Sequence, residues 1–288
     1  MEIETTIAGV RTRRRSERDA GRCAALVPTM GFLHEGHLSL VRRAHELADR
    51  VWVSVFVNPT QFGPGEDFDR YPRDLERDLG MLRDVGVNAV FAPSIEEMYP
   101  RPPVVEISFS GLEGILCGAS RPTHFGGVGL VVSKLLNIVQ PEVAVFGQKD
   151  AQQALLIRRL VEDLDMPVTI EVAPTLREAD GLAMSSRNAY LSPADRRAAP
   201  VLYRALREAA EAIAAGERDP ARVTTVMRTV VEAQPSVELE YAACVRQSDL
   251  SVPDRVNCPV LLAVAARLGA TRLIDNLPVV PPAEEDDS

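Results

Sequence analysis

The stretch VWVSVFVN, residues 51–58, constrains the fold of this chain more than any other segment. Up to Asn58 it consists of β-forming residues, and Ser54 is its one polar interruption. A strand with one solvated face alternates apolar and polar residues, whereas a strand buried on both faces does not. The stretch therefore predicts an interior strand of a parallel sheet that helices cover on both sides.

Strand and helix patterns alternate around this strand. Strand-like runs occur at residues 24–27, 87–94, 142–148 and 167–175, and helix-like runs at residues 37–50, 74–86, 126–141 and 150–165. Strands that alternate with helices at this spacing form βαβ units. We predict an α/β fold, a Rossmann-like doubly wound parallel sheet, in residues 1–175.

After Thr175 the pattern changes. Alanine-rich amphipathic helices are indicated at residues 192–217 and 219–234, and strands at residues 237–246 and 259–276. Ser192 before Pro193 is typical of a helix N-cap followed by proline at the first helical position. We predict a second, smaller α+β domain at residues 176–288, which acts as a lid and ends in a disordered acidic tail.

Composition argues against several classes of function. Of the 288 residues, 46% are hydrophobic and 25% are charged, which is typical of a globular protein with a buried core. No apolar run approaches the ~20 residues that a membrane helix needs. The net charge of −9 disfavours a nucleic-acid partner, because phosphate backbones are bound by dense basic patches.

Two features of the sequence bear on cellular location. The arginine-rich N-terminus has no apolar region of the kind found in secretory signals, and we predict that it forms an amphipathic surface helix. The four cysteines are widely spaced and form no C-x-x-C pair, which argues against a structural zinc site and a disulfide framework. We therefore predict a cytoplasmic protein with reduced thiols.

Half of the four histidines lie in the motif PTMGFLHEGH, where His34 and His37 are three residues apart. They follow the predicted strand at residues 24–27 and open the next helix. In open α/β sheets, ligands bind beyond the carboxyl ends of strands. The helix N-terminus favours an anion, the imidazoles can donate to phosphate oxygens, and Gly36 allows close approach to the backbone. We predict a phosphate-binding site here.

Two other interpretations of this pair stay open. A catalytic zinc site of the H-E-x-x-H kind needs histidines four residues apart and a third ligand, but HEGH places them three apart. Only His45 and His124 remain as further histidines. Alternatively, both members of the pair are structural or surface residues.

Polar side chains follow the strongest predicted strand. Asn58, Gln61 and Tyr71 lie in the loop after residues 51–58. Neutral amides recognise hydroxyls and carboxylates, because they both donate and accept hydrogen bonds. The position of the loop, directly after a core strand, favours a ligand-binding role over an ordinary surface loop.

Only two of the 32 basic residues are lysines. Lysine and arginine are not interchangeable, so a remaining lysine is a candidate for a place where a compact ammonium group matters. Lys149 follows the strand at residues 142–148 and opens a helix, with Asp150 as a candidate N-cap and Gln153 one turn on. Lys134 lies within a helix pattern, and we predict that it is a surface residue with a buried stem.

A fourth cluster is the loop READGLAMSSRN, residues 177–188. Ser185, Ser186 and Arg187 offer two hydroxyls and a guanidinium beside a glycine-containing turn. Hydroxyl and guanidinium groups bind phosphate oxygens well, and such loops often close over a ligand. We predict a second set of phosphate contacts here.

In this order the clusters resemble the pantothenate synthetase (pantoate–β-alanine ligase) family. The motifs PTMGFLHEGH, VFVNPTQF, RPTHFGGV, FGQKD, QQ, READGLAMSSRN and RLIDN carry the resemblance along nearly the whole chain. HEGH is similar to the H-I-G-H signature of nucleotidylyltransferases and class I aminoacyl-tRNA synthetases. MSSR occupies the place of their mobile phosphate-binding loop.

The resemblance implies a two-step, ATP-dependent ligase reaction. Pantoate and ATP form pantoyl adenylate and pyrophosphate, and the amine of β-alanine then attacks the acyl carbon to give pantothenate and AMP. The resemblance also implies Mg²⁺ on the leaving phosphates and a homodimer. Its substrates are small molecules, so no nucleic acid or membrane partner is expected.

The resemblance further implies roles for particular residues. The catalytic residues would be His34, His37, Lys149 and Arg187. The ATP site would be formed by Met30, Gly31, His34, Gly36, His37, Gly147, Gln148, Lys149, Asp150, Leu176, Met184, Ser185, Ser186 and Arg187. Pantoate would be bound by Pro28, Met30, Asn58, Gln61, Phe62 and Gln153, and β-alanine by Gln61 and Tyr71; the metal ligands are not indicated.

One position departs from the family pattern. The family commonly has glutamate where this chain has Gln148, which matters only if that side chain helps to hold the metal.

The alternative to the ligase reaction is that of a nucleotidylyltransferase, which transfers AMP to a phosphorylated small molecule. Gln61 and Gln153 favour a polar acid substrate over a phosphorylated one, which would require extra arginines. A non-catalytic nucleotide sensor would keep the same site.

Overall fold

The computed structural model describes residues 1–283 of the chain. They form two compact units, Met1–Gln148 with Gln153–Pro174, and Lys149–Gln152 with the chain from Thr175 onward. The division at residue 175 that the sequence indicates stays a prediction. Residues 284–288, which make up most of the tail predicted to be disordered, lie outside the described residues.

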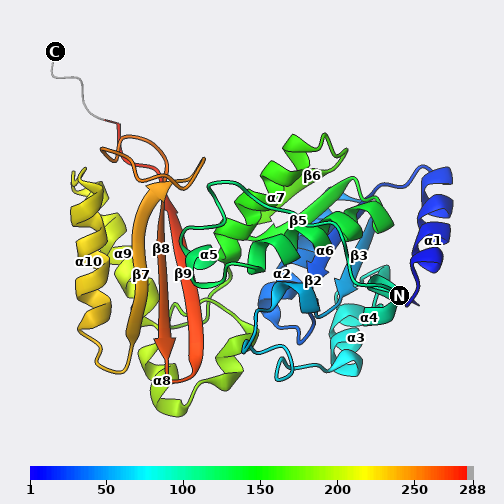
Figure 1. Cartoon of the computed structure of the whole chain (residues 1–288), viewed down its shortest axis with the longest axis horizontal. Helices are drawn as coiled ribbons and strands as arrows, with labels where there is room; N and C mark the ends of the chain where they lie inside the picture. The colour runs from blue at the N-terminus through cyan, green and yellow to red at the C-terminus, as the bar shows by residue number, and fades with distance from the viewer. Residues whose placement is uncertain (284–288) are drawn as a thin grey trace. The chain divides into compact units, whose positions relative to one another are not determined.

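The first unit contains a six-stranded sheet in which every pairing is parallel. Its strands lie in the order β1-β4-β3-β2-β5-β6, and Figure 1 labels β3, β2, β5 and β6 of this sheet. They are β1 (Glu2–Glu4), β2 (Ala24–Thr29), β3 (Arg50–Val55), β4 (Ala89–Phe91), β5 (Val143–Gly147) and β6 (Thr169–Ala173). The predicted Rossmann-like parallel sheet is confirmed.

Helices cover both faces of this sheet. The helical elements are α1 (Ile7–Asp19), α2 (Glu35–Leu47), η1 (Pro59–Gln61), α3 (Leu75–Asp84), α4 (Ile95–Met98), α5 (Cys117–Ser120), α6 (His124–Val139), η2 (Gln148–Asp150) and α7 (Ala151–Asp163). Leu26 and Trp52 face a core that includes α1 and α6, whereas Val27 and Val53 face a core that includes α2 and α3. Residues 51–57 lack polar alternation because both faces of β3 are buried.

The direction of winding reverses at β2. From this strand the sheet extends to β3 and β4 on one side and to β5 and β6 on the other. Ala25 of β2 lies opposite Val143 of β5, and continuing this register brings Thr29 level with Gly147. The carboxyl ends of β2 and β5 therefore lie at the same edge, where open α/β sheets bind their ligands.

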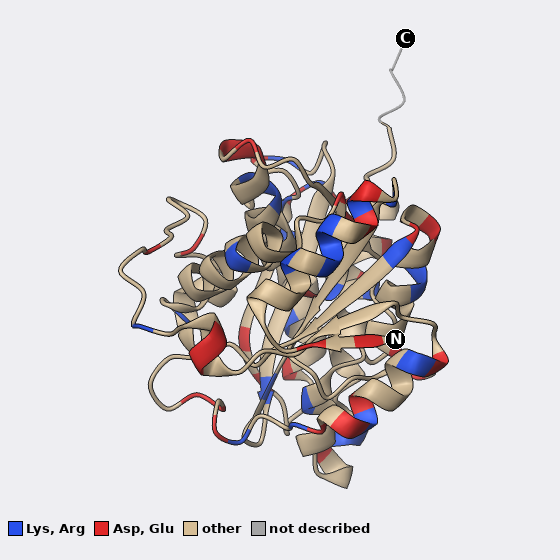
Figure 2. Ribbon diagram, turned by 90° about the vertical axis from the view of Figure 1, so that its right-hand side faces the viewer, with Lys and Arg blue, Asp and Glu red and all other residues tan. Residues whose placement is uncertain are grey.

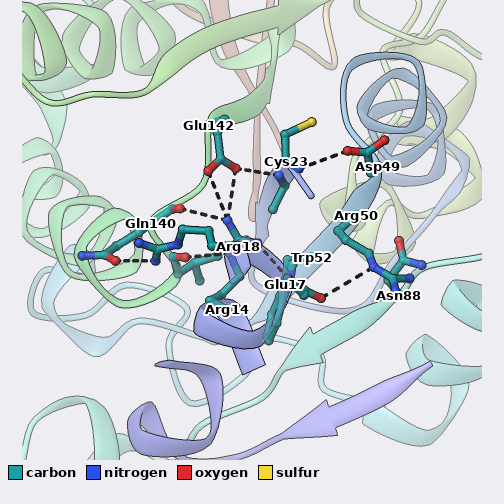
Figure 3. A network of polar contacts seen from close by, with 12 residues as sticks. Arg14, Glu17, Arg18, Cys23, Asp49, Arg50, Trp52, Asn88, Gln140 and Glu142 are labelled. Carbon is teal, nitrogen blue, oxygen red and sulfur yellow. Dashed lines mark hydrogen bonds and ion pairs between the residues drawn. The ribbon is translucent and has the colours of Figure 1, made fainter. Parts of the chain in front are cut away.

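The arginine-rich N-terminal segment contains one element that the sequence did not indicate. A short strand, β1, precedes the predicted helix and pairs with β4. The helix α1 is amphipathic, and its buried face includes Arg14, which is fully buried. Its Nε donates to the carbonyl oxygen of Val139 at 3.0 Å, and its terminal nitrogens lie 2.8 Å from Glu17 and 3.1 Å from Glu142. Figure 3 shows this network, in which Glu17 also accepts a hydrogen bond from Trp52. A buried guanidinium group is tolerated only when it has such partners.

The second unit contains an antiparallel sheet of β7 (Glu238–Arg246), β8 (Val260–Leu268) and β9 (Thr271–Val279). Its core includes residues of α9 (Val201–Ala214), α10 (Pro220–Glu232) and the three strands. The pattern at residues 192–217 forms two helices, α8 (Pro193–Ala198) and α9, because proline at position 200 cannot continue a helix. Ser192 caps α8 as predicted, since its Oγ accepts from the backbone N–H of Asp195.

Charges of both signs are interspersed along the chain. In Figure 2 blue and red segments alternate along several helices, and the strand that begins at the N-terminus is largely red. On α9, for example, Arg207 and Glu211 form an exposed ion pair of 2.8 Å. Within residues 1–283, no helix combines the length and apolar character that spanning a membrane requires.

Candidate active site

The loop between β2 and α2 has a constrained backbone. Gly31 has a φ of 83° and Phe32 a φ of 50°, so both are left-handed. A Cβ atom on Gly31 would lie 3.0 Å from both Asp78 Oδ2 and Val55 Cγ1. Both the backbone conformation and the limited space therefore require glycine at this position. The loop leads directly to His34.

His34 and His37 hydrogen bond reciprocally at the start of α2. His34 is the N-cap residue, and its Nδ1 accepts the backbone N–H of Gly36 at 3.1 Å. His37 Nδ1 accepts the backbone N–H of His34 at 3.3 Å, and the ring centroids are 4.1 Å apart. Because a backbone N–H can only donate, both Nδ1 atoms must accept. The proton of each neutral ring therefore belongs on Nε2, which faces away from the capping bond.

Gln61 ends η1, and its side-chain amide is held in one orientation. Asn58 Nδ2 donates to Gln61 Oε1 at 3.1 Å, and Gln61 Nε2 donates to Met30 Sδ at 3.1 Å. Asn58 is only 1% exposed, and its Oδ1 accepts from the Tyr99 hydroxyl at 2.9 Å. Because Asn58 is buried, it is better placed to orient Gln61 toward a ligand than to contact the ligand directly, as the sequence predicts.

Three residues of the RPTHFGGV motif support Gln61, although sequence analysis gave none of them a role. The carbonyl oxygen of Gln61 accepts from His124 Nδ1 at 2.9 Å and from Arg121 at 3.3 Å. A Cβ atom on Gly127 would lie 2.1 Å from the carbonyl oxygen of Thr60, so α6 approaches η1 too closely for a side chain. The pair of glycines at the start of a helix pattern was the one signal of this close packing.

An aromatic group lies beside Gln61. The ring centroid of Phe62 is 5.4 Å from that of Phe68 and 6.1 Å from that of Tyr71, both in edge-to-face geometry. Tyr71 is 6% exposed, and Pro28 in β2 is half-buried. These apolar surfaces are chemically suited to a branched alkyl group. The predicted contacts of Pro28 and Phe62 with pantoate and of Tyr71 with β-alanine stay predictions.

The two lysines have different surroundings. Lys149 belongs to the second unit, where Asn276 Nδ2 donates to its carbonyl oxygen at 2.8 Å. Its side chain is 20% exposed, and Nζ lies 3.5 Å from Asp150 Oδ1. In the first unit, Lys134 Nζ lies 5.4 Å from the centroid of the Tyr99 ring. The aromatic ring already stabilises that ammonium, which favours Lys149 as the ligand-binding lysine.

The loop at residues 177–188 is a folded hairpin within the second unit. The backbone N–H of Met184 donates to the carbonyl oxygen of Leu176 at 3.0 Å, so these two predicted nucleotide contacts are neighbours. The next residue, Ser185, caps the turn η3 (Ser186–Tyr190), because its Oγ accepts from the backbone N–H of Arg187 at 3.3 Å. The turn places two hydroxyls and a guanidinium in consecutive positions.

The RLIDN segment of β9 holds both the hairpin and the lysine. Arg177, which opens the hairpin motif, contacts Asp275 through two hydrogen bonds of 2.6 and 2.9 Å. Asp275 is 3% exposed; burial raises the pKa of its carboxyl, and the hydrogen bonds from Arg177 oppose that change. The adjacent Asn276 binds the Lys149 carbonyl. The contribution of RLIDN is therefore one of support.

We expect Asp275→Asn to lower the free energy of unfolding by about 2 kcal/mol, because it leaves the guanidinium of Arg177 without its countercharge. Urea unfolding followed by circular dichroism measures this change. The matched control is Glu211→Gln, which removes an exposed pair with Arg207 and should cost less than about 0.5 kcal/mol. Equal midpoints for the two variants would contradict the expectation.

The predicted site residues fall into two groups. The first unit contains Pro28, Met30, Gly31, His34, Gly36, His37, Asn58, Gln61, Phe62, Tyr71, Gly147, Gln148 and Gln153. The second unit contains Lys149, Asp150, Leu176, Met184, Ser185, Ser186 and Arg187. Within residues 1–283, no group of three or more His, Cys, Asp or Glu side chains forms a ready-made metal site.

A parallel sheet with two imidazoles beyond the carboxyl end of β2 defines a Rossmann-like protein, and the start of α2 is its candidate ligand site. Comparison with known proteins gives the family. The family model for pantoate-beta-alanine ligase matches residues 2–278, and the chain belongs to this family.

Several individual relatives are similar along almost their whole length. The pantothenate synthetase of Pelotomaculum thermopropionicum is 53% identical over 276 residues, which are 96% of this chain and 98% of that protein. The crystal structure of pantothenate synthetase from Thermus thermophilus matches with a TM-score of 0.92 and 45% identity, covering 98% of this chain and all of that one. The pantoate-beta-alanine ligase of Francisella tularensis, solved in complex with beta-gamma ATP and beta-alanine, matches with a TM-score of 0.81 and 34% identity, covering 96% and 97% of the two chains.

Proposed function

We propose that this chain condenses pantoate with β-alanine by way of pantoyl adenylate, at the expense of ATP. One observation carries the proposal beyond family membership. The carboxyl ends of β2 and β5 share an edge of the sheet, and they lead respectively to the histidine pair and to Gly147, which Gln148 and Lys149 follow. This is the position at which open α/β sheets bind nucleotides.

In the first step, a carboxylate oxygen of pantoate attacks the α-phosphorus of ATP, and pyrophosphate leaves. A carboxylate is already nucleophilic, so no general base is required. The step requires alignment of the attack and stabilisation of negative charge that grows on the phosphates. We assign this role to the Nε2–H groups of His34 and His37 at the start of α2, where the helix dipole also favours an anion.

The second unit would supply the remaining phosphate contacts. We assign the ammonium of Lys149, the hydroxyls of Ser185 and Ser186 and the guanidinium of Arg187 to the same triphosphate. Charge-assisted hydrogen bonds of this kind are stronger than neutral ones. The support within this unit is local, because β9 holds the lysine through Asn276 and the hairpin through Arg177.

Pantoate would be recognised mainly by two amides, those of Gln61 and Gln153. The Oε1 atom of Gln61 already accepts from Asn58, so its Nε2–H group is the part that can donate to a carboxylate or hydroxyl. Met30 and Phe62 would contact the two methyl groups of pantoate. A phosphorylated acceptor is disfavoured, because these groups bring no positive charge.

In the second step, the amine of β-alanine attacks the acyl carbon, the acyl–phosphate bond breaks and AMP leaves. The amine must be deprotonated when it attacks, and water must be kept from the mixed anhydride. We propose that Gln61 and Tyr71 contact β-alanine. The aromatic group of Phe62, Phe68 and Tyr71 would limit access of water to the acyl carbon.

We include Mg²⁺ in the proposal as a metal that arrives with ATP. Mg²⁺ commonly binds nucleotide phosphates with several waters and one or two carboxylates, and does not need a protein cage. That habit fits the residues described here, which lack a cluster of three metal-binding side chains. When bound, the metal would neutralise charge on the departing pyrophosphate.

We further propose that the protein is a cytoplasmic homodimer. Its cysteines form no disulfide within the described residues, which fits a reducing compartment. The dimer rests on family resemblance alone. Light scattering coupled to gel filtration tests it: a mass near twice 31.4 kDa is expected, and a mass near 31.4 kDa at micromolar concentration would reject it.

The reaction is tested by incubating the protein with ATP, Mg²⁺ and pantoate, with and without β-alanine. We expect multiple turnovers of AMP and pyrophosphate only when β-alanine is present. Without it, pyrophosphate should appear in an amount close to that of the enzyme, and hydroxylamine should trap the activated acyl group. A nucleotidylyltransferase would retain AMP in its product, and a nucleotide sensor would bind ATP without releasing pyrophosphate; either result would reject the proposal.

A further inference from the structure

A buried carboxylate lies against the loop that leads to the histidine pair. Asp78 is on α3, and it is only 1% exposed. One of its oxygens accepts the backbone N–H of Phe32 and the other that of Leu33, both at 2.7 Å. Both carboxylate oxygens are therefore committed to two consecutive amides of a loop 45 residues away in the sequence.

The loop needs such a partner because its backbone conformation is energetically unfavourable without one. Phe32 has a φ of 50°, a backbone conformation that residues other than glycine, asparagine and aspartate rarely adopt. Such a residue persists only when its surroundings hold it. Asp78 and Val55 also fill the space where a Cβ atom of Gly31 would lie, at 3.0 Å each. The carboxylate thus binds the amides of residues 32 and 33 and occupies the space beside residue 31.

These three residues determine where α2 begins. Leu33 is followed directly by His34, whose Nδ1 receives the Gly36 amide and whose own amide binds His37. A shift of the Leu33 peptide would move the N-cap and with it both imidazoles. Arg77, the neighbour of Asp78, lies over the Phe32 ring with its Cζ 5.2 Å from the centroid, so α3 holds the loop through two adjacent residues.

We propose that Asp78 is a positioning residue for the phosphate-binding histidines: it fixes residues 31–33 so that the two Nε2–H groups are preorganised for the triphosphate. The inference rests on the function proposed above and adds to it a residue that touches no substrate. An ionised carboxylate is required, since an amide has one acceptor and would direct an N–H group at one of the two backbone donors.

Burying the negative charge of Asp78 costs free energy, and the hydrogen bonds from the loop offset that cost. Burial raises the pKa of Asp78, and the hydrogen bonds from Leu33 and Phe32 counteract that rise. The charged groups nearest to it on its own helix are Arg77, 3.7 Å from its carboxylate, and Asp74. Carboxylates that accept backbone N–H bonds are stabilised in their ionised form.

The test compares Asp78→Asn with Asp74→Asn. Asp74 is an exposed N-cap of α3, and asparagine caps helices equally well, so the same chemical change one turn earlier should leave activity unchanged. For Asp78→Asn we expect kcat/KM for ATP to fall at least about tenfold, the scale of one lost charge-assisted hydrogen bond. The KM for pantoate should change less than twofold, because Gln61 is held by other contacts.

A second readout separates positioning from general stability. In Asp78→Asn, amide hydrogen exchange at Phe32 and Leu33 should accelerate at least about tenfold, while exchange in β3 and β5 stays unchanged. Normal ATP kinetics despite faster exchange would overturn the inference. Equal losses for ATP and pantoate, together with faster exchange throughout the first unit, would do the same, because they would indicate a purely structural role.

The inference remains testable if Asp78→Asn does not fold. In the wild-type protein, the Phe32 and Leu33 amides should exchange slowly although they lie in a loop; rapid exchange would reject the hydrogen bonds themselves. The outcome is also separable from that of the proposed function. Normal kinetics in Asp78→Asn alongside an inactive His37→Ala removes only this inference, whereas an active His37→Ala removes the role assigned to the histidines.

Discussion

Substitution of His37 by alanine should lower the rate of pantoyl adenylate formation at least about 100-fold, which corresponds to ~2.7 kcal/mol of activation free energy. The variant loses the Nε2–H donor and also the Nδ1 acceptor that binds the His34 amide. Pyrophosphate release in a single turnover with ATP and pantoate measures the step directly, before β-alanine is added.

Two further variants separate these contributions. His37→Asn keeps an acceptor close to the position of Nδ1 but has no group at the position of Nε2. If it is as slow as His37→Ala, the lost donor explains the effect, whereas recovery of activity would assign the effect to the helix cap. His45→Ala, on the last turn of the same helix, should leave the rate unchanged, because the His45 ring contacts only the Val85 carbonyl at 3.1 Å among the contacts described.

Lys149→Ala should produce a loss of similar size, at least about 100-fold in adenylate formation. The ammonium is the one lysine charge assigned to the triphosphate. The variant should fold, because Asn276 binds the backbone carbonyl of Lys149 and not its side chain. Single-turnover pyrophosphate release again measures the rate, and thermal unfolding checks that stability is retained.

The matched control for this prediction is Lys134→Arg. Arginine keeps a cation over the Tyr99 ring, so the variant should have wild-type activity. Near-normal turnover in Lys149→Ala would remove that lysine from the charge-stabilising groups. An inactive Lys134→Arg would show that the wrong lysine was assigned to the triphosphate.

The fold of the first unit could be predicted because its strands and helices bury distinctive patterns. Trp52 and Val53 face opposite cores, so β3 had to be apolar throughout, and this pattern is visible in the sequence. β1 was missed because a strand of three residues with two glutamates has no such pattern. It exists because β4 offers an edge to pair with, and that edge is known only after the chain has folded.

The candidate site can be inferred from the sequence where neighbouring residues would create the chemistry, and not where distant ones would. His34 and His37 adjoin each other, and their place after a strand is enough to indicate an anion site. Asp78 was not identified, since one aspartate among the charged residues of an amphipathic helix is usually solvated. His124 was set aside as a leftover imidazole, although it donates to the Gln61 carbonyl from the start of α6.

The reciprocal bonds of His34 and His37 restrict which residues evolution can place there. Each ring must accept a hydrogen bond from a main-chain N–H at Nδ1 and offer an N–H donor at Nε2. Lysine and arginine have no atom that can do the former, so a stronger positive charge at either position would cost the start of α2 a capping hydrogen bond. At these two positions, helix capping and the proposed phosphate contact would both favour histidine.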